Sequence, residues 1–209
     1  MVAIIDYDAG NLKSVQNALK KLGSESVITR DPQVLAGADH VILPGVGAFG
    51  DAMAQIASLD LVDVIRKVAG SGVPFLGICL GMQLLFEKSE ESPGVTGLDL
   101  LPGEILRIPD GKDDTGRDLK IPHIGWNSLE FPSACPLFEG LGEDPFVYFV
   151  HSYYLRAYDT GIVAATTQYS TCIHAAAWKD NLFGCQFHPE KSGDVGEKIL
   201  KNFLGLSRS

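Results

Sequence analysis

The chain has 209 residues, a formal net charge of −9 and a hydrophobic content of 45%, which predict a single globular domain over residues 1–209. An acidic chain repels nucleic acid and anionic membrane surfaces, so we expect neither as a partner. The sequence shows no secretory signal, no apolar run of membrane-spanning length and no CxxC pair among its four cysteines. We therefore expect a cytoplasmic protein without disulfides, metal or cofactor.

Strands and helices alternate through the first half of the chain. Short apolar runs predict strands at residues 2–6, 25–29, 40–45 and 74–78. Amphipathic stretches predict helices at residues 12–22, 50–57, 61–70 and 80–89. Asn11 is the candidate N-terminal cap of the first helix, and Gly23 the residue that ends it. This order predicts an α/β fold whose mostly parallel central sheet carries helices on both faces.

The second half is dominated by strand-like runs. These runs lie within residues 98–108, 121–131, 146–155, 162–169, 173–180 and 182–190. They predict antiparallel strands that extend the edge of the sheet or form a second sheet. Residues 109–118 are polar and rich in turn formers, which predicts a surface loop. A last helix is expected from about Val195 to Leu204, with Ser192 as its candidate cap.

One cysteine stands at the predicted junction of a buried strand and a helix, in the stretch "GICLG". Ligands of parallel sheets gather at the carboxyl ends of strands, where Cys79 is expected. The pattern G-x-C-x-G is a thiol version of the nucleophile elbow, in which Gly77 and Gly81 allow a sharp turn. A helix N-terminus favours the thiolate, and the Leu80 amide would point at an oxyanion. A lone cysteine is usually buried packing, but the two glycines and the strand end favour a catalytic nucleophile. The other three are interpreted as structural: Cys135, Cys172 and Cys185.

A thiol nucleophile needs a base and a group that orients the base. His188 directly follows a strand-like run, and Glu190 lies two residues on, where an extended chain presents its side chain to the same side. We therefore predict a triad of Cys79, His188 and Glu190. His151 is the rival base, but no carboxylate stands near it in the sequence. The remaining histidines are interpreted as structural or surface residues: His40, His123 and His174.

A glycine-rich turn, "PGVGAFGDA", follows the third strand and opens a helix. It lacks the Lys-Ser/Thr of a P-loop, so nucleotide binding is a weak interpretation. Backbone amides around Val46 and Gly47 are better placed to stabilise an oxyanion formed at Cys79. A plain tight turn is the alternative.

These segments together resemble the class I (triad) glutamine amidotransferases. "GICLGMQLLFE", "PGVGAFGDA" and "HPEKS" carry that resemblance, which extends over nearly the whole chain. Four further segments resemble the glutaminase subunits of imidazole glycerol phosphate synthase within that family: "DYDAGNLKSVQNAL", "IPHIGWN", "YFVHSYY" and "FHPEKS".

The resemblance implies a reaction, a substrate and a partner. Glutamine is expected to bind beside Cys79 and to be hydrolysed to glutamate and ammonia through a thioester. Gln83, Ser152 and Tyr153 resemble residues of the substrate site. The ammonia would pass to a (β/α)₈-barrel cyclase subunit in a heterodimer of histidine biosynthesis. Trp126 and Lys191, both close to predicted site segments, are candidates for the interface with that subunit.

Three other interpretations remain open from the sequence. The glutaminase subunit of pyridoxal phosphate synthase shares the triad, although "PHIGWN" and "HPEKS" resemble it less. A non-catalytic α/β interaction domain would be favoured if triad residues were missing, and all three are present. A thiol hydrolase of related fold is disfavoured by the full set of amidotransferase segments.

Overall fold

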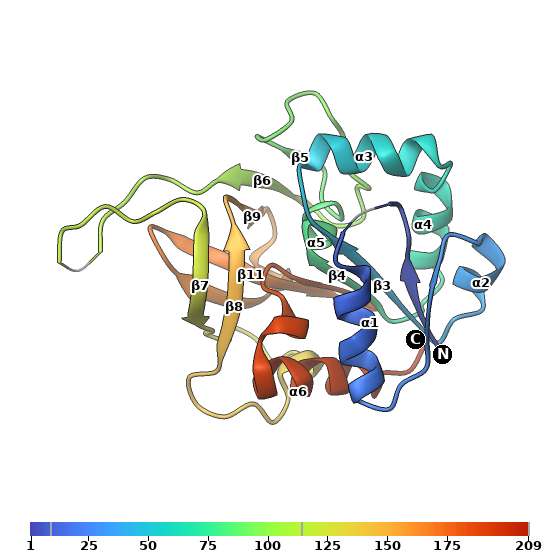
Figure 1. The fold of residues 1–209 in the computed structure, drawn as a ribbon. Helices are drawn as coiled ribbons and strands as arrows, with labels where there is room; N and C mark the ends of the chain where they lie inside the picture. Colours follow the sequence, from blue (N-terminus) through green and yellow to red (C-terminus); the bar gives the residue numbers. More distant parts are fainter. Residues whose placement is uncertain (9, 114, 209) are drawn as a thin grey trace.

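A computed structural model describes residues 1–8, 10–113 and 115–208. Ala9 of the segment "DYDAGNL", Asp114 of the predicted surface loop and Ser209 lie outside the described residues. Figure 1 shows a large central sheet with helices on both sides and a separate strand pair, β7 and β8, at one end. The predicted α/β class with a mostly parallel centre and added antiparallel strands is confirmed.

The ten-stranded sheet begins with five parallel strands. In spatial order these are β2 (Ser26–Thr29), β1 (Val2–Ile5), β3 (His40–Gly45), β4 (Phe75–Cys79) and β12 (Leu182–Cys185). The sheet continues through β11 (Cys172–Lys179), β9 (Tyr153–Ala157), β6 (Gly103–Arg107) and β5 (Lys88–Ser89), with β10 (Val163–Gln168) paired to β11. The second sheet pairs β7 (His123–Ser128) with β8 (Phe146–His151). The carboxyl ends of β3 and β4 are adjacent, because Gly45 pairs with Cys79.

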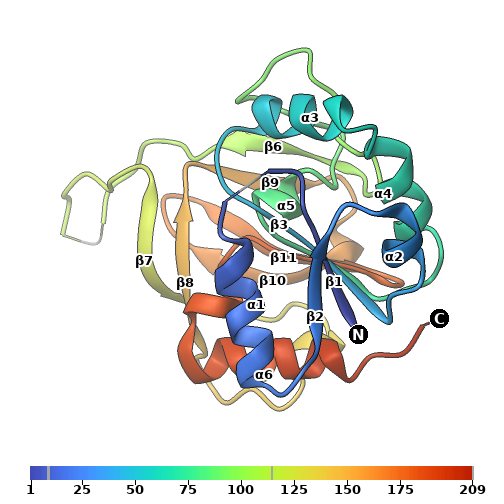
Figure 2. The same cartoon turned by 45° about the vertical axis from the view of Figure 1, so that its right-hand side comes forward.

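Helices cover both faces of the parallel part (Figures 1 and 2). The helices are α1 (Leu12–Lys21), α2 (Pro32–Ala36), α3 (Phe49–Ser58), α4 (Val62–Ala69), α5 (Leu80–Gln83) and α6 (Gly193–Leu204). The described residues also form 3₁₀ turns at Pro136–Phe138, Thr160–Ile162 and Pro189–Lys191. The apolar stripes of α1 and α6 pack on one face, and those of α3 and α4 on the other. Alternate residues of β1 enter the two cores, as the period of a strand requires.

The helix expected over residues 80–89 is wrong in length, since α5 ends at Gln83. The carbonyls of Leu84 and Leu85 accept hydrogen bonds from Leu98 and Leu100 instead of from the next helical turn. A buried crossing segment therefore replaces the helix, and residues 88–89 join the sheet edge as β5. The sequence also did not reveal α2, which Asp31 caps through its side chain.

Two predicted caps use their side chains differently. Asn11 and Ser192 occupy N-cap positions, but neither side chain caps its helix. Asn11 Nδ2 donates to Glu190 Oε1 at 2.6 Å, and Ser192 Oγ donates to the His188 carbonyl at 2.6 Å. In both cases a contact with a residue of the candidate site replaces the side-chain cap of the helix.

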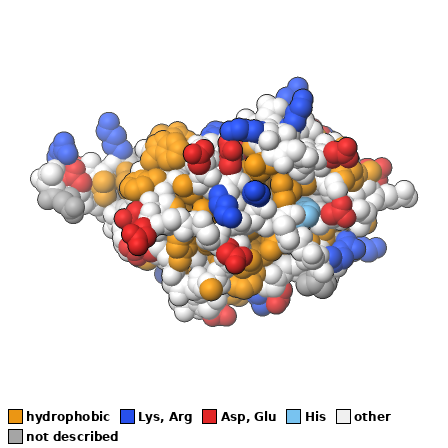
Figure 3. Space-filling view, turned by 90° about the horizontal axis from the view of Figure 1, so that it is seen from below, with side chains coloured by type: hydrophobic (Ala, Val, Ile, Leu, Met, Phe, Trp, Pro, Cys, Tyr) orange, Lys and Arg blue, Asp and Glu red, His pale blue; other side chains and the backbone are white. Residues whose placement is uncertain are grey.

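Figure 3 shows the molecule from below relative to Figure 1, and on this face acidic and basic side chains are interspersed with apolar ones. Within the described residues, no helix combines the length and apolar character needed to cross a bilayer.

Candidate active site

Cys79 ends β4 in a strained conformation. Its φ of 56° and ψ of −114° lie outside the regions that ordinary residues adopt. The predicted need for small neighbours is confirmed: a Cβ on Gly81 would lie 1.8 Å from the Leu43 carbonyl oxygen, and one on Gly77 2.7 Å from the Gly81 oxygen. Close contact between strand and helix therefore produces the turn that holds the thiol at the sheet edge.

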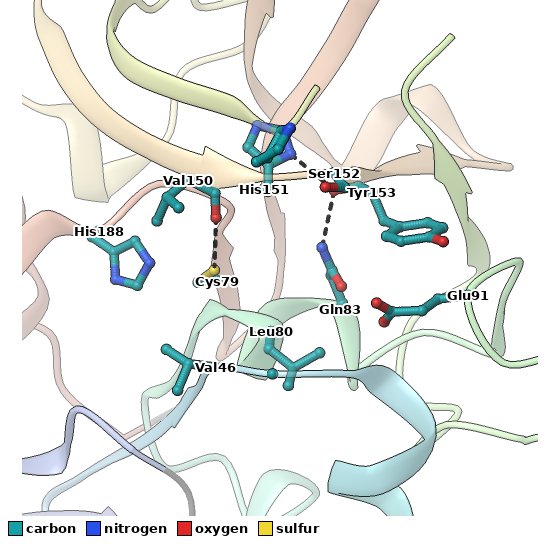
Figure 4. Close-up of a pocket in the computed structure, with 12 residues that line it drawn as sticks. Val46, Cys79, Leu80, Gln83, Glu91, Val150, His151, Ser152, Tyr153 and His188 are labelled. Carbon is teal, nitrogen blue, oxygen red and sulfur yellow. Dashed lines mark hydrogen bonds between the residues drawn. The ribbon is translucent and has the colours of Figure 1, made fainter. Parts of the chain in front are cut away.

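The thiol faces a cavity and is only 7% exposed. Cys79 Sγ lies 4.0 Å from the Val150 carbonyl oxygen and 3.8 Å from Gln186 Nε2. Figure 4 shows Cys79 between His188 on one side and Gln83 with Glu91 on the other. A bound molecule could thus contact the sulfur at one end and polar side chains at the other.

His188 and Glu190 form a buried pair beside Cys79. His188 Nδ1 lies 2.8 Å from Glu190 Oε1, and the two side chains are 1% and 0% exposed. The contact arises in a 3₁₀ turn beyond the end of β12 rather than in the extended strand that we expected. Asn11 holds the carboxylate and Ser192 holds the His188 backbone. The structure therefore brings Cys79 and His188 to one cavity, with Glu190 held behind His188.

The charge state of His188 follows from these contacts. Burial alone would lower its pKa, but interactions with Cys79 and Glu190 raise the pKa to about 9. Nε2 is buried and has no hydrogen-bond partner among the described residues. Because Nδ1 is bound to Glu190, Nε2 is the nitrogen available to exchange a proton with a substrate.

The rival base, His151, is held neutral. Burial lowers its pKa to about 3, against the opposing effect of the Tyr153 carbonyl. His151 Nδ1 donates to that carbonyl at 2.8 Å, so Nε2 accepts from Nδ1 of His123 at 3.1 Å. Burial lowers the pKa of His123 to about 4. Among the described residues, no carboxylate contacts the His151 ring, which instead forms part of the cavity wall.

The cavity has a volume of about 300 Å³ and contains every predicted catalytic and substrate side chain except Glu190, which lies behind His188. Gln83 donates to the Tyr153 carbonyl and to Gln186 Oε1, at 3.0 and 2.9 Å. Its amide is thereby fixed, with the carbonyl oxygen left to accept from a ligand. Ser152, between β8 and β9, belongs to the same wall.

Sequence reasoning did not single out Glu91, which lines the cavity opposite His188 (Figure 4). Glu91 Oε2 accepts from the Phe49 amide at 2.7 Å at the start of α3. The acidic residues that follow the predicted helix of residues 80–89 were the available signal, but nothing in the sequence linked them to the site. Gln186 and Asn11, which hold Gln83 and Glu190, were also missed in these roles because their partners lie far along the chain.

The predicted oxyanion groups border the cavity on its lower side. Val46, Gly47 and Leu80 all line it, and Figure 4 shows Val46 and Leu80 below Cys79. Gly47 has a φ of 104°, which only glycine adopts readily. Trp126 and Lys191 do not line the cavity. Both side chains are exposed. Trp126 lies near Gly193, and Gly193 is two residues beyond Lys191 in the chain.

Comparison with known proteins places this chain in a family. The model of the glutamine amidotransferase class-I family matches residues 3–206. Two solved structures share the fold at 22% identity and a TM-score of 0.74: a glutamine amidotransferase, covering 98% of both chains, and PurLQS from Thermotoga maritima, covering 98% of this chain and 97% of that one. The chain belongs to the class-I glutamine amidotransferase family.

Curated relatives are similar over almost the full length. Imidazole glycerol phosphate synthase subunit HisH of Syntrophotalea carbinolica is 49% identical, covering 97% of this chain and 98% of that protein. The subunit HisH of Methanothermobacter thermautotrophicus is 48% identical over 100% of both chains. Within the class-I amidotransferases, the chain therefore groups with the HisH subunits.

Proposed function

We propose that this chain is the glutaminase subunit of imidazole glycerol phosphate synthase and that Cys79, His188 and Glu190 form its catalytic triad. The observation that carries the proposal is the meeting of the strained Cys79 with the buried His188–Glu190 pair at one cavity. Full-length similarity to HisH subunits supports the choice of synthase over other ammonia-channelling enzymes.

The cavity can hold glutamine with its side-chain amide at Cys79 and its amino-acid end at the opposite wall. There, the Glu91 carboxylate would attract the α-ammonium, and the Gln83 carbonyl oxygen would accept a hydrogen bond from it. Ser152 and Tyr153 close this wall from above. The elongated arrangement of one nucleophile and distant polar anchors favours an amino acid with a terminal amide.

The reaction then proceeds in two halves. The Cys79 thiolate attacks the amide carbon, forming a C–S bond and placing negative charge on the amide oxygen. His188 gives its Nε2 proton to the amide nitrogen, the C–N bond breaks and ammonia leaves a glutamyl thioester. His188 next accepts a proton from water, which attacks the thioester carbon and releases glutamate and the thiolate. Glu190 stabilises the imidazolium through 2.8 Å contact with Nδ1.

The oxyanion of each half-reaction needs backbone donors. The Leu80 N–H is one candidate, and an amide of the Val46–Gly47 turn is the other. Glycines on both sides of Val46 let its peptides rotate at low steric cost. In one orientation an N–H points at the oxyanion, and in the other a carbonyl points there. Loss of one oxyanion donor costs on the order of 10²–10³ in rate. Such a rotation would couple glutamine hydrolysis to the partner.

The partner is a (β/α)₈-barrel cyclase that receives the ammonia. An apolar surface beside the cavity suits such a partner: Ile124, Trp126 and Phe146 on β7 and β8 are 60%, 55% and 49% exposed. The surface is continuous with the cavity through Val150, which pairs with Ile124. Lys191 adds a cation next to the triad. A cytoplasmic location remains our prediction from the sequence.

Activity of the reconstituted pair tests the proposal. The chain is combined with an imidazole glycerol phosphate synthase cyclase subunit, and synthesis is measured with glutamine and with ammonia. We expect Cys79→Ala to abolish the glutamine-dependent reaction and to leave the ammonia-dependent one intact. Retention of glutamine-dependent turnover would contradict the nucleophile, and failure of the wild-type pair to use glutamine would contradict the function.

A further inference from the structure

Tyr7 lies behind the proposed oxyanion turn, and its hydroxyl has no hydrogen-bond partner in the part of the chain that the structure describes. The side chain is 1% exposed, and its hydroxyl is fully buried with no hydrogen-bond partner among the described residues. An unpaired buried hydroxyl is unfavourable, and such groups are rare in folded proteins. Tyr7 belongs to none of the catalytic or substrate-binding groups described above, so its unpaired hydroxyl requires an explanation.

The hydroxyl lies against the residue that precedes Val46. A Cβ on Gly45 would be only 2.5 Å from Tyr7 Oη, so glycine is required there for the ring to approach the backbone. Gly45 pairs with Cys79 across β3 and β4, and burial, with a smaller contribution from the nearby Cys79, raises the pKa of Tyr7. Tyr7 is therefore a neutral hydrogen-bond donor close to both the nucleophile and the oxyanion turn.

The turn also separates two cavities. Val46 and Gly47 line the glutamine cavity and, in addition, a second cavity of about 310 Å³ whose wall includes Tyr7. A Cβ placed on Gly47 would meet no atom within 4 Å. The peptides of this turn thus border open space on both sides, and Tyr7 lines the second cavity but not the glutamine cavity.

We propose that Tyr7 is a positioning residue of the oxyanion turn, whose hydroxyl donates to the Gly45 carbonyl when the Gly45–Val46 peptide directs its N–H at the oxyanion. One peptide carries its N–H and C=O in opposite directions, so turning the N–H of Val46 toward Cys79 turns the carbonyl of Gly45 toward the rear cavity. The hydroxyl then gains the acceptor that it lacks. The new hydrogen bond from the buried Tyr7 hydroxyl therefore favours this orientation of the Gly45–Val46 peptide.

This inference rests on the proposed glutaminase function, and Tyr7→Phe tests it because only the hydroxyl is removed. A net hydrogen bond corresponds to about tenfold in rate. In the complex with the cyclase and its ligand, we expect kcat for glutamine hydrolysis to fall about tenfold while KM stays within twofold. Tyr158→Phe, which alters a 51% exposed tyrosine outside both cavities, is the control and should match the wild type.

A second measurement separates an oxyanion effect from general damage. Glutamate γ-semialdehyde forms a tetrahedral hemithioacetal with the thiol, so its binding depends on the oxyanion donors, whereas L-glutamate binding does not. Tyr7→Phe should weaken the semialdehyde about tenfold and leave glutamate unchanged, with an unaltered melting temperature. Unchanged kcat, or equal weakening of both ligands, would overturn the role of Tyr7. A wild-type complex that does not hydrolyse glutamine would instead refute the function itself.

Discussion

Replacement of Glu190 by glutamine should remove a negative charge from the triad and leave the positions of its side chains unchanged. The amide oxygen of glutamine can still accept from His188 Nδ1 and Asn11 Nδ2, which both reach the same oxygen of Glu190. The second carboxylate oxygen has no partner among the described residues, so an amide NH₂ would replace it without breaking a contact. The variant therefore keeps the ring orientation and removes one negative charge.

The magnitude follows from the pKa of His188. Its rise from 6.5 to about 9 corresponds to about 3 kcal/mol of stabilisation of the imidazolium, because one pKa unit is about 1.36 kcal/mol. Glu190 is one of two anions responsible, so its loss should lower the pKa by about one to two units. That corresponds to about 1–3 kcal/mol, or about 10–100-fold in kcat. His188→Ala should be more harmful, because His188 itself transfers protons.

The assay is the pH dependence of glutamine hydrolysis in the complex with the cyclase. His188 must be protonated to release ammonia, so its raised pKa preserves activity up to about pH 9. In Glu190→Gln, His188 loses its proton at a lower pH. The decline of activity at alkaline pH should therefore begin one to two pH units lower. Glu197→Gln removes a carboxylate from the surface pair with Lys21 and should change neither quantity. An unmoved alkaline decline with kcat within threefold of wild type would refute this account of Glu190.

Three further changes should have distinct effects. Glu91→Gln should raise KM for glutamine with little change in kcat in steady-state assays, since the α-ammonium loses the same interaction in the ground and transition states. Gly81→Ala should lower the melting temperature or prevent folding, because its Cβ would overlap a backbone oxygen, whereas Gly142→Ala meets no atom within 4 Å; equal melting temperatures would contradict the crowded turn. Lys191→Glu should weaken binding of the cyclase, as measured by calorimetry. Lys67→Glu on α4 makes the same charge change away from the cavity and should leave the affinity unchanged. Unchanged affinity in both variants would remove Lys191 from the interface.

Local patterns in the sequence were sufficient for the parallel core and for the position of the nucleophile. Apolar runs fully buried between helices specify β1, β3 and β4. The glycines of "GICLG" specify the turn at Cys79, because only residues without a side chain allow the observed approach of strand and helix. His188 and Glu190 were found because they are two residues apart and a short turn brings them together.

Only the tertiary structure decided which distant groups complete the site. Helical periodicity predicted a helix through residue 89, but long-range hydrogen bonds from residues 97–101 end α5 at Gln83 and leave Glu91 facing the cavity. Asn11 carries a cap signature, yet its amide binds a carboxylate 179 positions away. The unpaired hydroxyl of Tyr7 is visible only when the packing around Gly45 is known. Local propensities amount to a few tenths of a kcal/mol to about 1 kcal/mol per residue, and buried long-range contacts of comparable or greater strength override them.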